Sequence, residues 1–114
     1  MSDCIFCKIV NGDIPSTKVY ENEYVYAFRD LEPVAPTHVL IIPKEHIQSL
    51  DYMNESNIEL LGKLMLAAKE IARFEGLSEN GYRVVNNNGL MGGQTVNHFH
   101  LHLVGGRSMQ WPPG

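Results

Sequence analysis

A row of alternating histidine and apolar residues constrains this chain more than any other stretch. Residues 98–104 read His-Phe-His-Leu-His-Leu-Val. Strict alternation is the period of a β-strand, whose successive side chains point to opposite faces, whereas a helix would scatter the imidazoles. We therefore predict a strand here. It would carry three imidazoles (His98, His100 and His102) on one face and three core side chains (Phe99, Leu101 and Leu103) on the other.

Glycine pairs flank this predicted strand. Gly92-Gly93 precede it closely and Gly105-Gly106 follow it. Glycines allow backbone N–H groups to approach a ligand, and the neutral donors of Gln94 and Thr95 stand beside the first pair. A row of imidazoles next to open backbone donors suits a bound phosphate.

The histidine row admits three interpretations. Several neutral imidazoles on one strand can bind Zn²⁺, an imidazole can attack phosphorus as a nucleophile, or the histidines can be hydrogen-bonded core residues. Three imidazoles on one face, flanked by glycines, argue against the third interpretation. No Asp or Glu follows residue 80, so no carboxylate there can complete a metal site. The residues favour phosphorus chemistry.

The rest of the sequence predicts an α+β fold in one domain, residues 1–114, with an antiparallel sheet of about five strands. A short apolar helix begins at Cys4 and ends before Gly12. Alternation predicts a hairpin over 17–21 and 24–29. An apolar β-branched run predicts a central strand over 38–43, and another strand is predicted over 82–87. One long helix is predicted from 57 to 75, opened by the capping box Ser56-x-x-Glu59.

Charge and hydropathy exclude some classes of function. The net charge is −4, which argues against an extended nucleic-acid or acidic-membrane surface. No apolar run reaches the roughly 18 residues of a membrane span, and the first residues lack the pattern of a signal peptide. We therefore expect a cytoplasmic protein that binds neither nucleic acid nor membrane.

Together these motifs resemble the histidine triad (HIT) nucleotide-binding family, whose signature is His-x-His-x-His with apolar spacers. The resemblance covers nearly the whole chain. It includes Cys-Ile-Phe-Cys-Lys-Ile at 4–9, Ala-Pro-Thr-His at 35–38 and Ile-Pro-Lys-Glu-His-Ile at 42–47. Gly-Gly-Arg at 105–107 and Trp-Pro-Pro-Gly at 111–114 resemble the purine nucleoside phosphoramidase (HINT) branch.

The resemblance implies a HIT-like fold and a mechanism. His100 would attack the α-phosphorus of a purine mononucleotide derivative, form a nucleotidyl-histidine and expel an amine. His102 and His38 would hold the phosphate and assist protonation, while His98 would order the row. Hydrolysis of dinucleoside polyphosphates, or nucleotide sensing with little turnover, are the alternative functions.

The resemblance also assigns the nucleotide's contacts. Asn87, Gly93, Gln94 and Thr95 would hold phosphate oxygens and the leaving group. Asp30 would bind the ribose hydroxyls, because a carboxylate accepts two O–H bonds at once. An apolar set would sandwich an AMP-type or GMP-type purine: Ile5, Phe6, Ile9, Ile14, Phe28 and Leu31.

The pair Cys4-x-x-Cys7 has its own alternatives. Two thiolates with two histidines make a tetrahedral Zn²⁺ set, and by resemblance His46 and His98 would complete it as a structural site. The pair could instead be two packed, reduced cysteines; a redox role lacks the surrounding βαβ pattern. No organic cofactor is implied. The family's homodimer would use the long helix, whose apolar stripe is wider than one sheet face needs.

Overall fold

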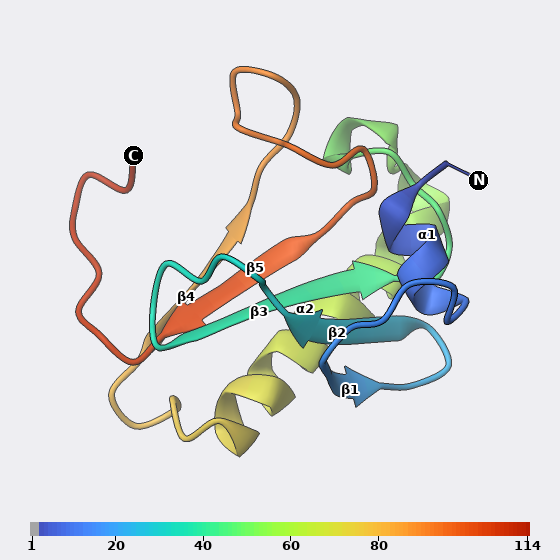
Figure 1. Ribbon diagram of the computed structural model, residues 1–114. Helices are drawn as coiled ribbons and strands as arrows, with labels where there is room; N and C mark the ends of the chain where they lie inside the picture. Colours follow the sequence, from blue (N-terminus) through green and yellow to red (C-terminus); the bar gives the residue numbers. More distant parts are fainter. Residues whose placement is uncertain (1–2) are drawn as a thin grey trace.

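The computed structural model describes residues 3–114 and contains one antiparallel sheet with helices on both sides (Figure 1). The sheet has the strand order β1-β2-β3-β5-β4. Its strands are β1 (Lys18–Glu21), β2 (Val25–Arg29), β3 (Thr37–Pro43), β4 (Tyr82–Asn86) and β5 (Leu101–Gly105); the helices are α1 (Ile5–Val10), α2 (Ile58–Phe74) and the 3₁₀ turns η1 (Leu50–Tyr52) and η2 (Glu55–Asn57). The predicted α+β fold is confirmed.

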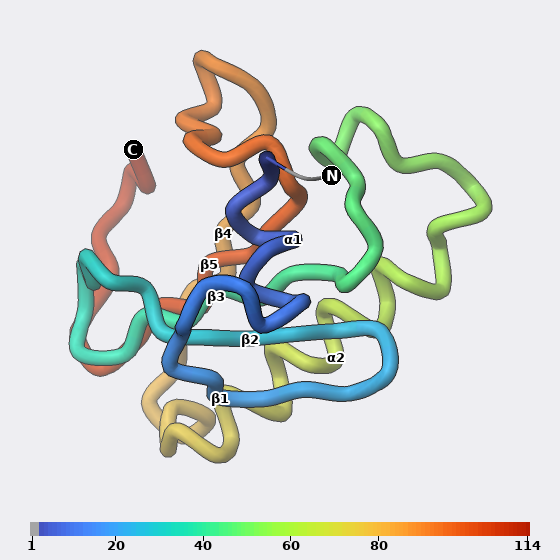
Figure 2. Tube along the Cα trace, turned by 45° about the vertical axis from the view of Figure 1, so that its right-hand side comes forward, coloured from blue at the N-terminus to red at the C-terminus, as the bar shows by residue number. Residues whose placement is uncertain are grey.

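Each face of the sheet packs on a different helix, and this decides which side chains meet. On one face α2 covers a cluster that includes Val39, Ile41 and Leu103. On the other face the short α1 covers Phe28, Leu40 and Ile42 (Figures 1 and 2). Because alternate residues of a strand face opposite ways, β3 supplies apolar side chains to both clusters and is buried along nearly its whole length.

The histidine row differs from the prediction in its first half. Strand β5 begins only at Leu101, so His98 and His100 lie in the irregular segment that leads into it. Hydrogen bonds outside the ladder explain this, because the Phe99 N–H donates to the Ile47 carbonyl. The apolar half of the alternation holds, since Phe99, Leu101 and Leu103 all enter the core beneath α2.

The start of the long helix also differs from the prediction. The capping box before it is not Ser56 with Glu59 but Asn54 with Asn57, two residues earlier. The Asn54 Oδ1 accepts from the Ser56 N–H at 2.9 Å, and the Asn57 Oδ1 accepts from the Asn54 N–H at 2.9 Å. This box opens η2, which runs directly into α2. Within residues 3–114, no helix is long and apolar enough to cross a membrane.

Candidate functional site

Strand register brings three distant parts of the sequence together on the α1 side of the sheet. Leu40 of β3 stands opposite Phe28 of β2 on one side and His102 of β5 on the other. One step along, the Asp30 N–H donates to the His38 carbonyl and extends the β2–β3 ladder. Diagonal neighbours in a sheet lie within reach of long side chains, so Asp30, His38 and His102 converge.

These three side chains form a hydrogen-bonded chain with a defined proton arrangement. The Val34 N–H donates to Nδ1 of His38 at 3.1 Å, so the proton of a neutral His38 sits on Nε2. That Nε2–H faces Nδ1 of His102 at 2.9 Å and Oδ2 of Asp30 at 3.4 Å. His102 must then carry its own proton on Nε2. Burial lowers the pKa of both imidazoles, that of His102 to about 4, so both are neutral at pH 7.

His100 presents a free ring nitrogen. Its Nδ1–H donates to the His98 carbonyl at 2.8 Å, which leaves the lone pair on Nε2. Burial lowers the pKa of His100, and the ring packs edge-on against Phe6 at 5.2 Å and against His102 at 5.0 Å between centroids. A neutral imidazole with a fixed orientation and an unbonded nitrogen can act as a nucleophile.

A cavity of about 400 Å³ adjoins the imidazoles of His38, His100 and His102. Most of the residues predicted to contact a nucleotide line it. They are Ile5, Phe6, Ile9, Phe28, Asp30, Leu31, His38, Thr95, His100 and His102. The lining therefore combines apolar side chains with imidazoles, a carboxylate and hydroxyls, as a ligand with an aromatic ring and a phosphate requires.

Five residues predicted for nucleotide binding or catalysis lie outside this lining. Ile14 packs against the apolar cluster beneath α1, and His98 is fully buried. The Gln94 side chain is engaged by backbone groups, because its Nε2 donates to the carbonyls of Gln48 and Val96 and its Oε1 accepts from the Gly89 N–H. Asn87 and Gly93 face each other in that loop. Their predicted phosphate contacts stay a prediction.

The structure also adds residues that sequence reasoning missed. The cavity wall includes Pro15, Ser16, Thr17, Val34 and Val96. Outside the wall, Asn86 donates through Nδ2 to the His100 carbonyl at 3.0 Å. Only the register of β4 against β5, which pairs Asn86 with Leu101, could have indicated that contact.

Cys4, Cys7, His46 and His98 meet in a second cluster, beside the N-terminus of α1. The Nε2–H of His98 donates to the Pro43 carbonyl at 2.8 Å, so its Nδ1 offers a lone pair to the cluster. Around that lone pair lie Sγ of Cys4 at 3.4 Å, Sγ of Cys7 at 3.6 Å and Nδ1 of His46 at 3.2 Å. The Cys7 Sγ lies 3.3 Å from the same nitrogen of His46.

These spacings fit a tetrahedral zinc set. Zn–N bonds of about 2.0–2.1 Å and Zn–S bonds of about 2.3 Å separate two nitrogens by about 3.3 Å and sulfur from nitrogen by about 3.5 Å. The distances within the cluster fall near both values. The group Asp30, His38 and His102 also has metal-ligand chemistry, but His38 does not fit, because the Val34 bond places a proton on the nitrogen that would have to bind.

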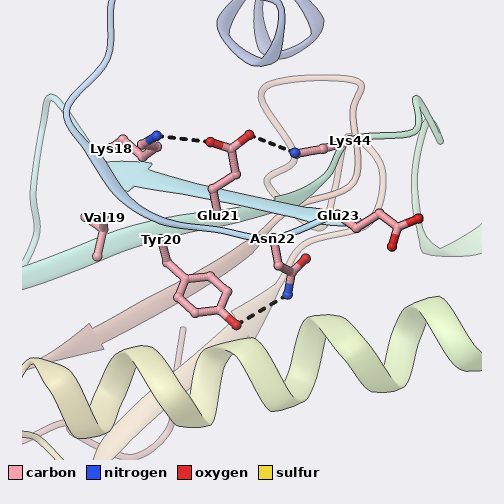
Figure 3. Close-up of a pocket in the computed structure, with 7 residues that line it drawn as sticks. All are labelled: Lys18, Val19, Tyr20, Glu21, Asn22, Glu23 and Lys44. Carbon is pink, nitrogen blue, oxygen red and sulfur yellow. Dashed lines mark hydrogen bonds and ion pairs between the residues drawn. The ribbon is translucent and has the colours of Figure 1, made fainter.

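A larger cavity, of about 580 Å³, lies at β1 and the turn after it (Figure 3). Three of its four charged side chains pair with one another, and Glu23 is the fourth. Glu21 accepts from Lys18 at 3.0 Å and from Lys44 at 2.7 Å, and Asn22 donates to the Tyr20 hydroxyl at 3.3 Å. It is lined by no imidazole or thiol, so size alone does not make it the functional site.

Comparisons with known proteins agree with this geometry. The family model described as HIT domain matches residues 11–109. The chain is 56% identical to the 14 kDa zinc-binding protein of Zea mays, over 99% of this chain and 89% of that one. It is 49% identical to adenylylsulfatase HINT1 of Arabidopsis thaliana, over 99% and 78%. The crystal structure of a HIT family hydrolase from Legionella pneumophila Philadelphia 1 superimposes with a TM-score of 0.97, at 54% identity over 98% of this chain and 100% of that one.

Proposed function

This chain belongs to the HIT domain family, and on that premise we propose that it hydrolyses purine nucleoside 5′-phosphoramidates. The observation that carries the proposal is the state of His100: buried and neutral, bonded through Nδ1 to the His98 carbonyl, and beside a cavity that suits a nucleotide. Relatives named as HIT family hydrolases and as HINT1 support hydrolysis within this family.

The proposed reaction has two displacements at the α-phosphorus. The lone pair on Nε2 of His100 forms a P–N bond while the bond to the substrate's amine breaks. The leaving amine needs a proton, and His102 carries one on Nε2. His38 keeps that proton on Nε2 of His102, because its own Nε2–H donates to Nδ1 of His102 at 2.9 Å. Water then attacks phosphorus, returns one proton to Nε2 of His102 and releases the nucleoside monophosphate as the P–N bond to His100 breaks, so both imidazoles are restored.

Amine release from adenosine 5′-phosphoramidate tests the proposal. We expect His100→Ala to lower kcat/KM by roughly a thousandfold or more, because it removes the group that forms the intermediate. Lys69→Ala, an exposed change on α2, is the control and should leave the rate unchanged. Equal release by His100→Ala and wild type would refute the role of His100, and a wild type without turnover would favour the sensor alternative.

A second candidate substrate is adenylyl sulfate, which the name of the Arabidopsis relative favours. The same displacement by His100 applies, with sulfate rather than an amine as the leaving group. Sulfate leaves as an anion without being protonated, so the His102→Gln variant should lose less activity on adenylyl sulfate than on the phosphoramidate. A diadenosine polyphosphate, assayed in parallel, tests the dinucleoside alternative.

We further propose that Cys4, Cys7, His46 and His98 hold a structural Zn²⁺. The support is the tetrahedral spacing of the four donor atoms and the name of the Zea mays relative. Bound there, zinc would tie the start of α1 to the segment that carries His100. Metal content of the purified protein tests this: near one zinc per chain for wild type and for the control Asp30→Asn, and little for the double variant Cys4→Ser, Cys7→Ser.

A homodimer is the third part of the proposal. Large apolar side chains remain exposed on α2, namely Ile58, Met65, Leu66 and Phe74, and β4 ends the sheet with an open edge. A second copy of the chain would cover both features.

A further inference from the structure

The cavity beside the imidazoles crosses most of the sheet, and its far end has no assigned role. His100 and His102 lie at β5, Leu40 on β3, Phe28 on β2, and Thr17 next to β1, where its carbonyl accepts from the Arg29 N–H. Strands in a sheet are about 4.8 Å apart, so the three spacings from β5 to β1 amount to about 14 Å. A nucleotide with its phosphate at His100 would reach toward the segment before β1.

At that far end one hydroxyl has a fixed position. Ser16, half-buried, lines the cavity, and its Oγ lies 2.8 Å from the hydroxyl of Tyr26. Tyr26 is itself held, since its ring is buried and packs against Phe28 with centroids 5.9 Å apart. The serine hydroxyl is therefore preorganised next to the apolar wall where a base would stack.

Neighbouring polar groups are less suited to the same task. Arg29 also lines the cavity, but its guanidinium is bound through two nitrogens by the carboxylate of Glu75. Thr17 lines the cavity too, but the hydrogen bond that fixes it is made by its backbone carbonyl, and the residue is exposed. At this end of the cavity, the Ser16 hydroxyl is the one that a buried side chain, Tyr26, orients.

We propose that Ser16, oriented by Tyr26, recognises the polar group on the six-membered ring of the purine. This rests on the proposed function, because it places a nucleotide in this cavity. The two hydroxyls share two hydrogens and one is used between them, so one remains. If Tyr26 donates, Ser16 can donate to a carbonyl oxygen as in guanine; if Ser16 donates, its lone pairs can accept from an amino group as in adenine. The Ser16–Tyr26 pair therefore accommodates both adenine and guanine. It disfavours a purine that carries only hydrogen at this position of the six-membered ring.

Calorimetric titration with two ligands tests this: AMP, and the 5′-monophosphate of unsubstituted purine riboside. Wild type should bind AMP more tightly. Ser16→Ala should weaken AMP about three- to tenfold, the usual range for one neutral hydrogen bond, and should leave the unsubstituted ligand unchanged, so the preference disappears. Thr17→Val, which removes a neighbouring hydroxyl without changing shape, is the matched control and should keep the preference.

Tyr26→Phe provides a second, independent variant. It leaves Ser16 in place without its partner, so the preference for AMP should fall below that of wild type. Thermal unfolding of every variant shows which ones are folded. The proposal is overturned if both Ser16→Ala and Tyr26→Phe keep the wild-type preference, or if Thr17→Val abolishes it as fully as Ser16→Ala does.

The outcomes also separate this proposal from the proposed function. If wild type binds neither ligand, the nucleotide site itself is wrong. If all variants bind AMP equally and turn over the phosphoramidate, the site stands and only the role of Ser16 fails.

Discussion

At the scale of single residues, hydrogen bonds to the backbone decide what each imidazole can do. The Val34 N–H directs the His38 proton to Nε2, the His98 carbonyl holds Nδ1 of His100, and the Pro43 carbonyl holds Nε2 of His98. Three chemically identical rings thus differ in which nitrogen carries the proton and which nitrogen keeps its lone pair. No sequence pattern specifies this, because the partners are main-chain atoms placed by the fold.

The lowered pKa of His102 predicts a dependence of stability on pH. Its pKa falls from 6.5 to about 4 in the folded state, chiefly through burial, so the unfolded chain binds the extra proton first as pH drops. Stability from this group is therefore present above about pH 6.5 and is lost on the way down to pH 4. Urea unfolding at pH 7 and pH 5 should show a larger loss for wild type than for His102→Gln; equal losses would contradict the assignment.

Two glycines provide a matched pair of backbone tests. Gly106 has φ of +94°, and an added Cβ would lie 2.9 Å from Cβ of Pro36. Gly106→Ala should cost roughly 1–3 kcal/mol of unfolding free energy. Gly62 lies in α2 with open space around it, so Gly62→Ala should stabilise by roughly 0.5–1 kcal/mol. Chemical denaturation measures both, and a neutral Gly106→Ala would show that this turn can relax.

At the scale of elements, the strands and helices were readable from the sequence because each carries a clear period or, over 38–43, an apolar β-branched run. The hairpin, the central strand and the long helix all appear close to their predicted bounds. What the sequence could not supply was the register that joins them. His38 and His102 are 64 residues apart and meet because Leu40 pairs with His102. The register therefore brings Asp30, His38 and His102 together, whereas the Gln94 side chain is bound by backbone groups and does not line that cavity.

The capping of α2 can be tested directly, because two boxes compete in the sequence. Asn54→Ala should lower the unfolding free energy by about 1 kcal/mol, the usual value of a helix cap. Ser56→Ala should have a smaller effect, since its hydroxyl only donates to the Asn54 Oδ1. If thermal or urea denaturation reversed that order, the box seen in the structure would be the wrong one.

At the scale of the whole molecule, the exposed apolar face of α2 and the open edge of β4 predict self-association. Sedimentation velocity should show a dimer for wild type. The Leu66 side chain is 63% exposed in the single chain. Leu66→Glu should shift the population toward monomer, because dimerisation would bury the new charge. Leu50→Glu, exposed on η1 instead, is the control. A wild type that sediments as a monomer at micromolar concentration would contradict the proposed dimer.

His98 joins two neighbourhoods that a reader of the sequence would treat separately. Its ring lies among the thiols at the start of α1, and its carbonyl orients the ring of His100 two residues later. Damage at the amino terminus, whether oxidation of a thiol or a shift of α1, would therefore reach the reactive nitrogen through a single peptide unit. The position of the first turn of α1 is thus coupled to the orientation of the His100 ring, although the two lie near opposite ends of the sequence.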